Sequence, residues 1–188
     1  MANSNSISST KTFNPVQFTL WIAIASIIMM FSGLTSAYIV KRNLPDWQAL
    51  VFPSIFWFST VTILLSSLCL YWANKFFKEK KINQYQIFLL ITLVLGIAFI
   101  IFQWIGFTQL WNDGITFKGA SGGTQFLYVI AGLHLAHVIG GIIALLVSSI
   151  KSFVIKDTAK NSIKLVSIYW HFVDVLWLYL FIFFLIAK

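Results

Sequence analysis

The chain has 188 residues, of which 59% are hydrophobic, 18% aromatic and only 10% charged. A soluble domain carries about 25% charged residues, so this composition excludes an ordinary soluble globule and indicates a membrane protein. The net charge of +8 does not indicate a nucleic-acid partner, because the basic residues cluster between apolar runs as topology signals do. The single cysteine, Cys69, excludes a disulfide framework and a cysteine-based metal site.

Residues 1–15 form a polar tail rich in Ser, Asn and Thr, without the apolar core of a cleavable signal peptide. Residues 16–187 are predicted to form a single all-α transmembrane domain. It contains five apolar runs, and each reaches the ~20 residues that a membrane-crossing helix needs. The predicted spans are about 16–40, 50–73, 86–110, 126–150 and 164–187.

The basic residues predict the orientation of these spans. The N-terminal tail and the second and fourth connections lie on one side of the membrane and carry nine of the thirteen Lys and Arg residues. The other side carries Lys41, Arg42, Lys118 and Lys188. The positive-inside rule therefore predicts a cytoplasmic N-terminus and a C-terminus outside.

Small and hydroxylated residues mark the first, second and fourth spans. Gly33 and Ala37 form a small-xxx-small pair in the first span, which lets another helix come close. The hydroxyl groups of the second span can bond to their own helix and are interpreted as needing no functional explanation. They belong to Ser59, Thr60, Thr62, Ser66 and Ser67. The fourth span carries a predicted helix-packing seam. Its members are Gly132, Ala136, Gly140 and Ala144.

Polar residues at helical spacing occur in the last two spans. His171, Asp174 and Trp177 lie at intervals of three and share one broad helix face. Asp174 is the only acidic residue in the apolar runs, and a carboxylate there costs at least ~2.5 kcal/mol, so a protein partner is expected. In the fourth span, His137 follows His134 by one turn. At 1.5 Å per residue, His137 and Asp174 both lie about 15 Å deep, so a contact between them, direct or through water, is a hypothesis.

The residues alone leave three interpretations of this polar cluster, defined as His134, His137, His171, Asp174 and Trp177. The histidines could ligate a metal or haem, although His134 lies toward the outside and His171 toward the inside. Intramembrane Asp and His could form a proton path, but the first three spans contribute no titratable group at their centres. The cluster could instead hold helices together and position a neighbouring subunit or a lipid headgroup.

Three segments resemble a known family. Residues 169–177, Tyr-Trp-His-Phe-Val-Asp-Val-Leu-Trp, resemble the last-helix signature of subunit III of haem-copper terminal oxidases, the cytochrome c and quinol oxidases. Residues 126–141, with His134 and His137, are similar to that family's Gly-x-His-x-x-His-Val-x-x-Gly helix. Residues 21–38 are similar to the helix that opens its short, five-helix bacterial form.

The resemblance implies a non-catalytic subunit III of an aerobic respiratory oxidase in the bacterial cytoplasmic (inner) membrane. It implies haems and copper in subunits I and II, which reduce O2 and pump protons, and no cofactor bound by this chain. The chain would pack on subunit I, hold phospholipid and protect the catalytic subunit from inactivation during turnover. The electron donor stays open between cytochrome c and quinol. The alternatives are a subunit III-like protein associated with nitric oxide reductase and a small autonomous transporter.

One residue departs from the family pattern. The family usually has a Glu after Trp-x-x-x-x-Ser in the first helix, where this chain has Ile27. Ile27 lies about 15 Å into its span, level with His137 and Asp174. Because the acidic member on that helix is missing, the polar cluster is interpreted as serving helix packing and contacts with lipid or a subunit, rather than proton buffering.

Overall fold

The computed structural model describes residues 15–42, 53–112, 122–154 and 159–187, so the predicted polar tail lies almost wholly outside the described residues. The described chain consists of five helices: α1 (Pro15–Lys41), α2 (Ile55–Lys78), α3 (Ile82–Asn112), α4 (Gly122–Val154) and α5 (Ala159–Ile186). All five are long and apolar enough to cross a membrane. The prediction of an all-α protein with five membrane-spanning helices is therefore confirmed.

The helix ends differ from the predicted spans for local reasons. α2 begins at Ile55, about five residues later than expected, directly after the sequence Pro53-Ser54. The carbonyl of Pro53 accepts a hydrogen bond from the N–H of Phe56 at 3.2 Å, so the proline closes the first turn from outside the helix. α3, α4 and α5 extend beyond their predicted starts. Hydropathy identifies only the length of a helix that lies in the hydrocarbon core. The helical hydrogen bonds of the backbone continue beyond it, into the polar headgroup region.

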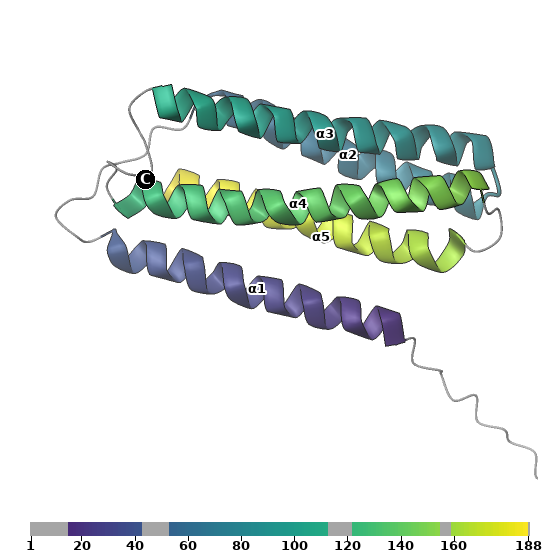
Figure 1. Cartoon of the computed structure of the whole chain (residues 1–188), viewed down its shortest axis with the longest axis horizontal. Coiled ribbons are helices and arrows are strands. Elements are labelled where there is room, and N and C mark those ends of the chain that lie inside the picture. Colours follow the sequence, from purple (N-terminus) through teal and green to yellow (C-terminus); the bar gives the residue numbers. More distant parts are fainter. Residues whose placement is uncertain (1–14, 43–52, 113–121, 155–158, 188) are drawn as a thin grey trace, which may run out of the picture.

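α2 and α3 are joined by a tight turn and pack on each other most extensively of all pairs. In this turn Lys80 adopts a left-handed φ of 60°. Nζ of Lys81 lies 2.9 Å from a carboxylate oxygen of Glu79. The hydrogen bond from Lys81 holds the pKa of the Glu79 carboxyl below its usual value. Such a short connection makes α2 and α3 antiparallel neighbours (Figure 1).

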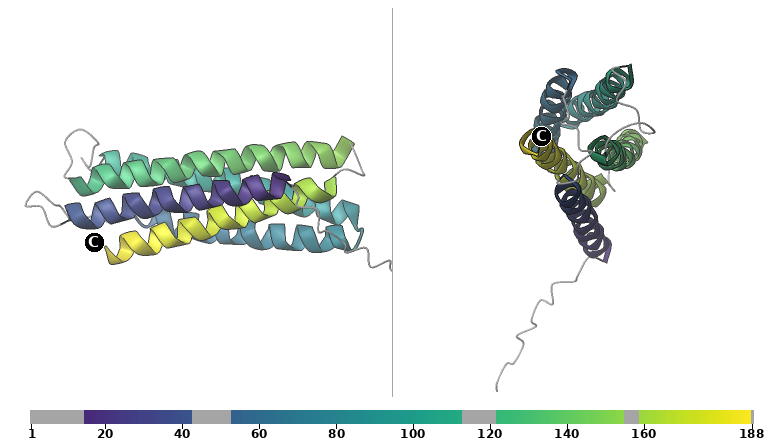
Figure 2. Two further views of the ribbon diagram at one scale, coloured as in Figure 1. Left: turned by 90° about the horizontal axis from the view of Figure 1, so that it is seen from below. Right: turned by 90° about the vertical axis from the view of Figure 1, so that its left-hand side faces the viewer.

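α1 lies at the edge of the bundle, as the view along the helices in Figure 2 shows, and among the described helices it contacts only α4 and α5. Its attachment is strongest near its C-terminal end. Oγ1 of Thr35 lies 3.0 Å from the hydroxyl of Tyr179. The hydroxyl of Tyr38 donates to the carbonyl of Ala187 at 3.3 Å. The N-terminal half of α1 buries only Ile24.

Trp170 of α5 fills the centre of the bundle and is 1% exposed. A Cβ added at Gly96 of α3 would lie 2.8 Å from Cη2 of its ring, and one added at Gly141 of α4 would lie 3.0 Å from Cε3. The indole therefore fits between α3 and α4 only because both helices present a glycine there. Its Nε1 donates to Oγ of Ser66 on α2 at 3.2 Å, so one side chain joins four helices.

We expect Gly96→Ala to destabilise the protein by about 1–3 kcal/mol, the usual cost of overpacking, since the buried ring has nowhere to move. Gly33→Ala is the matched control, because a Cβ at Gly33 meets nothing within 4 Å. The thermal midpoint of the purified protein in mild detergent measures both. Equal midpoints for the two variants would contradict this account of the Trp170 site.

Candidate functional site

Polar side chains of α2 and α5 face each other along the bundle interior and form what we call the α2–α5 ladder. In the described residues its rungs are Thr60–Trp177 (3.1 Å), Ser66–Trp170 (3.2 Å), Ser67–His171 (2.6 Å) and Asn74–Ser167 (2.6 Å). The two helices are antiparallel, and the pairs extend from Thr60–Trp177 to Asn74–Ser167 along the bundle. The ladder fixes the rotation of α5 against α2.

The prediction that the α2 hydroxyls bond to their own helix is confirmed for Ser59, Thr60 and Thr62. The interpretation that they need no further explanation is incomplete, because several of them also join other helices. Thr62 donates to its own helix at 2.8 Å. Ser66 instead donates to the carbonyl of Thr92 on α3 at 3.2 Å, and Ser67 pairs with His171. Ser59 and Thr60 bond to their own helix and also accept side-chain donors from α3 and α5. Hydroxyl groups that seemed locally satisfied are thus the acceptors that position two tryptophans.

Asp174 lies between two rungs of the ladder and is 2% exposed. The Ser67 hydroxyl approaches its carboxyl group. The approach does not meet hydrogen-bond geometry, however, and neither carboxyl oxygen has a partner among the described residues. As predicted from the spacing, Asp174 and Trp177 share one inward face with His171. The carboxyl group faces protein rather than lipid.

His137 is not the partner of Asp174. Its Nδ1 donates to the carbonyl of Leu133, one turn back on its own helix, at 2.7 Å. Its own carbonyl accepts a hydrogen bond from Tyr169 at 3.1 Å. The side chain is half-buried, and its ring centroid lies 5.8 Å from that of Phe31 on α1. The hypothesis of a direct His137–Asp174 contact is therefore wrong, because His137 has turned toward its own backbone and toward α1.

His134 occupies the position facing α5. It is 1% exposed, and its ring stacks on Trp177 with centroids 5.1 Å apart and planes at 30°. Phe99 and Phe31 meet it edge-on at 6.1 and 6.5 Å. Neither ring nitrogen has a hydrogen-bond partner among the described residues. The imidazole is thus held by aromatic rings from three helices.

The three histidines do not come together. His134 lies in its aromatic enclosure, His137 bonds to its own helix, and His171 bonds to Ser67. Within the residues that the structure describes, no three His, Cys, Asp or Glu side chains converge as a metal site would require. The geometry supports interhelical positioning better than ligation.

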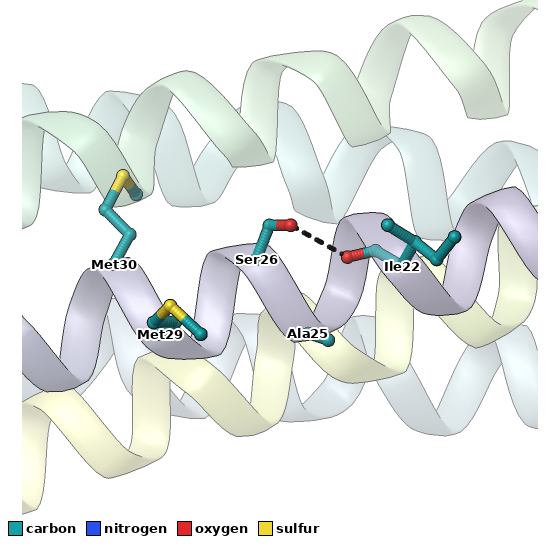
Figure 3. A pocket seen from close by; sticks show the side chains of 5 residues that line it. All are labelled: Ile22, Ala25, Ser26, Met29 and Met30. Atoms are coloured by element: carbon teal, nitrogen blue, oxygen red, sulfur yellow. Dashed lines mark hydrogen bonds between the residues drawn. The ribbon is translucent and has the colours of Figure 1, made fainter.

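Ile27 is half-buried and packs against the hydrophobic core. Next to it, a hollow of about 420 Å³ lies along α1, lined by Ile22, Ala25, Ser26, Met29 and Met30 (Figure 3). Figure 3 shows Met30 pointing toward α4, while the hydroxyl of Ser26 bonds to the carbonyl of Ile22 at 3.0 Å. The lining is almost wholly apolar, so the hollow suits hydrocarbon.

The predicted seam on α4 faces away from the bundle. Gly132, Ala136 and Gly140 are exposed, and Ala144 is half-buried. A Cβ at Gly132 would meet nothing within 4 Å, and one at Gly140 only the Tyr169 hydroxyl at 3.8 Å. Gly33 on α1 is similarly open. Close packing inside the bundle uses the neighbouring Gly141 and Gly96, which sequence reasoning missed. The buried tryptophan was the available signal, since so large a ring needs a small partner.

Comparisons with known proteins agree on one family. The family described as "Cytochrome c oxidase subunit III" matches residues 8–187. A "Probable quinol oxidase subunit 3" of Staphylococcus haemolyticus is 27% identical over 169 residues, 86% of this chain and 83% of the relative. "Cytochrome c oxidase subunit 3" of Bacillus subtilis is 27% identical, covering 86% of this chain and 81% of the relative. The human protein of that name is 32% identical over 126 residues, 66% of this chain and 47% of the relative.

Proposed function

Because the chain belongs to the cytochrome c oxidase subunit III family, we propose a non-catalytic, helix-positioning role for it within its complex. It is a multi-pass membrane protein and subunit III of a multi-subunit haem-copper oxidase. We place it in the bacterial cytoplasmic membrane with its N-terminus in the cytoplasm, which the lysine distribution supports. We propose a complex of the cytochrome c oxidase type, as in the Bacillus subtilis relative, with a quinol oxidase as the alternative that the staphylococcal relative represents.

In this proposal the haems and copper belong to subunits I and II, which reduce O2 and pump protons. The observation that carries the role of this chain is the α2–α5 ladder. His171 and Trp177 are rungs of it, and His134 is enclosed by aromatic rings. Of the titratable groups that a proton path would need, His171 is bonded to α2, His137 to its own helix, and His134 is enclosed by aromatic rings. They specify how the helices are turned and so which surface meets the partner subunit.

Asp174→Asn tests this role. We expect the oxidase to assemble with slightly lowered stability and near-normal O2 reduction and proton pumping. Asp174 makes no hydrogen bond among the described residues, so the change should cost no more than the about 0.6 kcal/mol that an interhelical polar contact averages within membranes. Oxygen consumption and the proton-to-electron ratio in vesicles are the measurements. Ser67→Ala is the matched control, because it removes a rung beside Asp174 without removing a titratable group. If Asp174→Asn assembled fully but lost proton pumping, while Ser67→Ala kept it, the helix-positioning role would be contradicted and a proton relay supported.

We further propose that the seam on α4 packs against subunit I. Three of its residues are exposed and leave the α4 backbone open along one line. Small residues in such a line let a second helix approach closely, and dispersion contacts then drive association in lipid. The exposed seam is the surface of this chain that best fits such a partner helix.

Ala136→Leu is expected to weaken this contact. The wild-type chain, purified in mild detergent, should bring haem-bearing subunits with it, and the leucine should lower their yield several-fold by holding the helices apart. Ala23→Leu places the same side chain on an exposed position of α1 and serves as control. The haem absorbance per mole of chain is the measurement. A wild-type chain that purifies alone would contradict the oxidase assembly itself, whereas equal yields from both variants would contradict only the seam.

The hollow beside Ile27 is proposed to hold a phospholipid acyl chain. Its volume of about 420 Å³ and apolar lining support this occupant. A lipid held there would fill the space beside the loosely attached half of α1 and keep α1 in position. Through such packing the chain is proposed to stabilise the catalytic subunit against inactivation during turnover.

A further inference from the structure

The hollow along α1 is bordered by a reactive group, the sulfur of methionine. The chain has three methionines, and two of them, Met29 and Met30, are neighbours in sequence that both line this hollow. Ser26 lies one turn before them, since residues three and four apart are neighbours on a helix surface. Figure 3 shows the side chains of all three residues around the hollow.

The two methionines differ in exposure. Met29 is 77% exposed and lies near the middle of α1, so its thioether faces the hydrocarbon of the bilayer. Met30 is half-buried, points toward α4 and packs against the hydrophobic core. An oxidant dissolved in the membrane therefore reaches the sulfur of Met29 more readily than that of Met30.

Oxidation has unequal consequences at these two positions. A sulfoxide converts an apolar side chain into a polar one and disrupts apolar packing. At Met29 the sulfoxide meets lipid, whereas at Met30 it lies against the core of the bundle. The N-terminal half of α1 buries only Ile24, so it has little other packing to hold it in place. Oxidation of Met29 is thus tolerable, and oxidation of Met30 loosens α1.

Ser26 supplies the polar contact that a peroxide group needs in hydrocarbon. Its hydroxyl donates to the carbonyl of Ile22 at 3.0 Å, which leaves its oxygen able to accept a hydrogen bond. Among the described residues that line the hollow, it is the only polar side chain. A hydroperoxide group that donates to this oxygen lies one helical turn from both sulfurs, with its hydrocarbon part against Ile22 and Ala25.

We propose that the hollow binds an organic hydroperoxide and that Met29 reduces it, which spares Met30. The sulfur of Met29 attacks the terminal peroxide oxygen, so a sulfur–oxygen bond forms as the oxygen–oxygen bond breaks. The sulfur loses two electrons and becomes a sulfoxide. The hydroperoxide is reduced to the alcohol, whose hydroxyl hydrogen is the one that the hydroperoxide carried. Sulfoxide reductases restore methionine, so the site can be used again. The proposal needs only a membrane-spanning chain and goes beyond the role in the oxidase.

The test treats the intact complex in vesicles with cumene hydroperoxide, and peptide mass spectrometry follows the sulfoxide at each methionine. Met29→Leu removes the reacting sulfur and nearly keeps the side-chain volume. Ser26→Ala removes the peroxide contact. Thr19→Ala is its matched control, because Thr19 carries an exposed hydroxyl on α1 outside the hollow. Adding Val40→Met to Met29→Leu returns an exposed sulfur to α1 away from the hollow.

We expect Met29 to be oxidised first. Met29→Leu should speed the oxidation of Met30 at least about two-fold, because two sulfurs no longer share one bound oxidant. Ser26→Ala should slow the oxidation of Met29 about five-fold, as the loss of one hydrogen bond does, and Thr19→Ala should leave it unchanged.

Equal effects of Ser26→Ala and Thr19→Ala would overturn the proposal, since the hollow would then not hold the peroxide. It would also be overturned if the sulfur added by Val40→Met protected Met30 as well as Met29 does, or if Met30 were oxidised first. Haem content verifies separately that each variant complex is assembled. These outcomes are therefore distinct from a failure of the oxidase assignment, in which haem-bearing subunits are absent.

Discussion

Trp170→Ala is expected to abolish stable incorporation of this chain into the oxidase. The indole is 1% exposed and lies between Gly96 and Gly141. Replacing a buried tryptophan by alanine costs about 3–5 kcal/mol, through lost burial and the cavity left behind. Ser66 also loses the donor that it accepts at 3.2 Å. Because folded proteins are stable by only about 5–15 kcal/mol, such a loss removes a large part of that stability.

The amount of this chain per haem in the purified complex is the measurement for Trp170→Ala, together with its thermal midpoint. Trp104→Ala is the matched control, because Trp104 is 70% exposed. Trp170→Phe keeps most of the ring and removes only the N–H, so it should fall between the two, losing about 1 kcal/mol for the hydrogen bond. If Trp170→Ala and Trp104→Ala were incorporated equally well, the indole could not be the centre of the packing.

Ile27→Glu is expected to lower the stability of the chain by at least about 2.5 kcal/mol if the new carboxyl group finds no partner. The position is half-buried against the core, beside an apolar hollow. Phe31 follows it by one turn and contacts His137. An acid at position 27 therefore comes within about one helical turn of an imidazole, and pairing with it should recover part of the cost.

A double-mutant cycle with His137→Phe separates the two contributions to this effect. We expect Ile27→Glu to be clearly more destabilising when His137 is absent, whereas the uncharged control Ile27→Gln should cost the same in both backgrounds. Proton uptake by the assembled oxidase is the second measurement. A change specific to Ile27→Glu would show that this site communicates with the catalytic subunit. Additive costs and unchanged proton uptake would show that position 27 and His137 act independently.

The sequence was sufficient for the architecture, because hydrocarbon thickness and apolar length determine which segments cross the membrane. The number of spans follows from that alone. The inward face containing Asp174 and Trp177 also followed, since an acid is costly against lipid. Each of these predictions uses only the length and the residue pattern of a single helix.

The relative rotation of neighbouring helices could not be predicted in the same way. A membrane helix is apolar on its lipid side as well as its protein side, so hydrophobic periodicity does not reveal its inner face. The sequence predicted a helix-packing seam on α4 without saying which partner it meets. The seam faces outward, and the close contact inside the bundle is made by Gly141. The depth of each residue in the membrane suggested His137 as the neighbour of Asp174. The rotation of α4 about its axis instead turns His134 toward α5, where it stacks on Trp177.

The sparse attachment of α1 also has a consequence for how the chain is made. α1 precedes α2 and α3 in the chain, whereas its neighbours α4 and α5 follow them and are therefore synthesised later. α2 and α3 can pair as soon as both are inserted, whereas α1 must wait in the lipid as a lone helix. Its hydroxyl groups need no neighbouring helix for a hydrogen bond, because Thr19, Ser26 and Thr35 each donate to a carbonyl one turn back on α1. The helix thus enters the bilayer with these hydroxyl groups already bonded, before any neighbour is available.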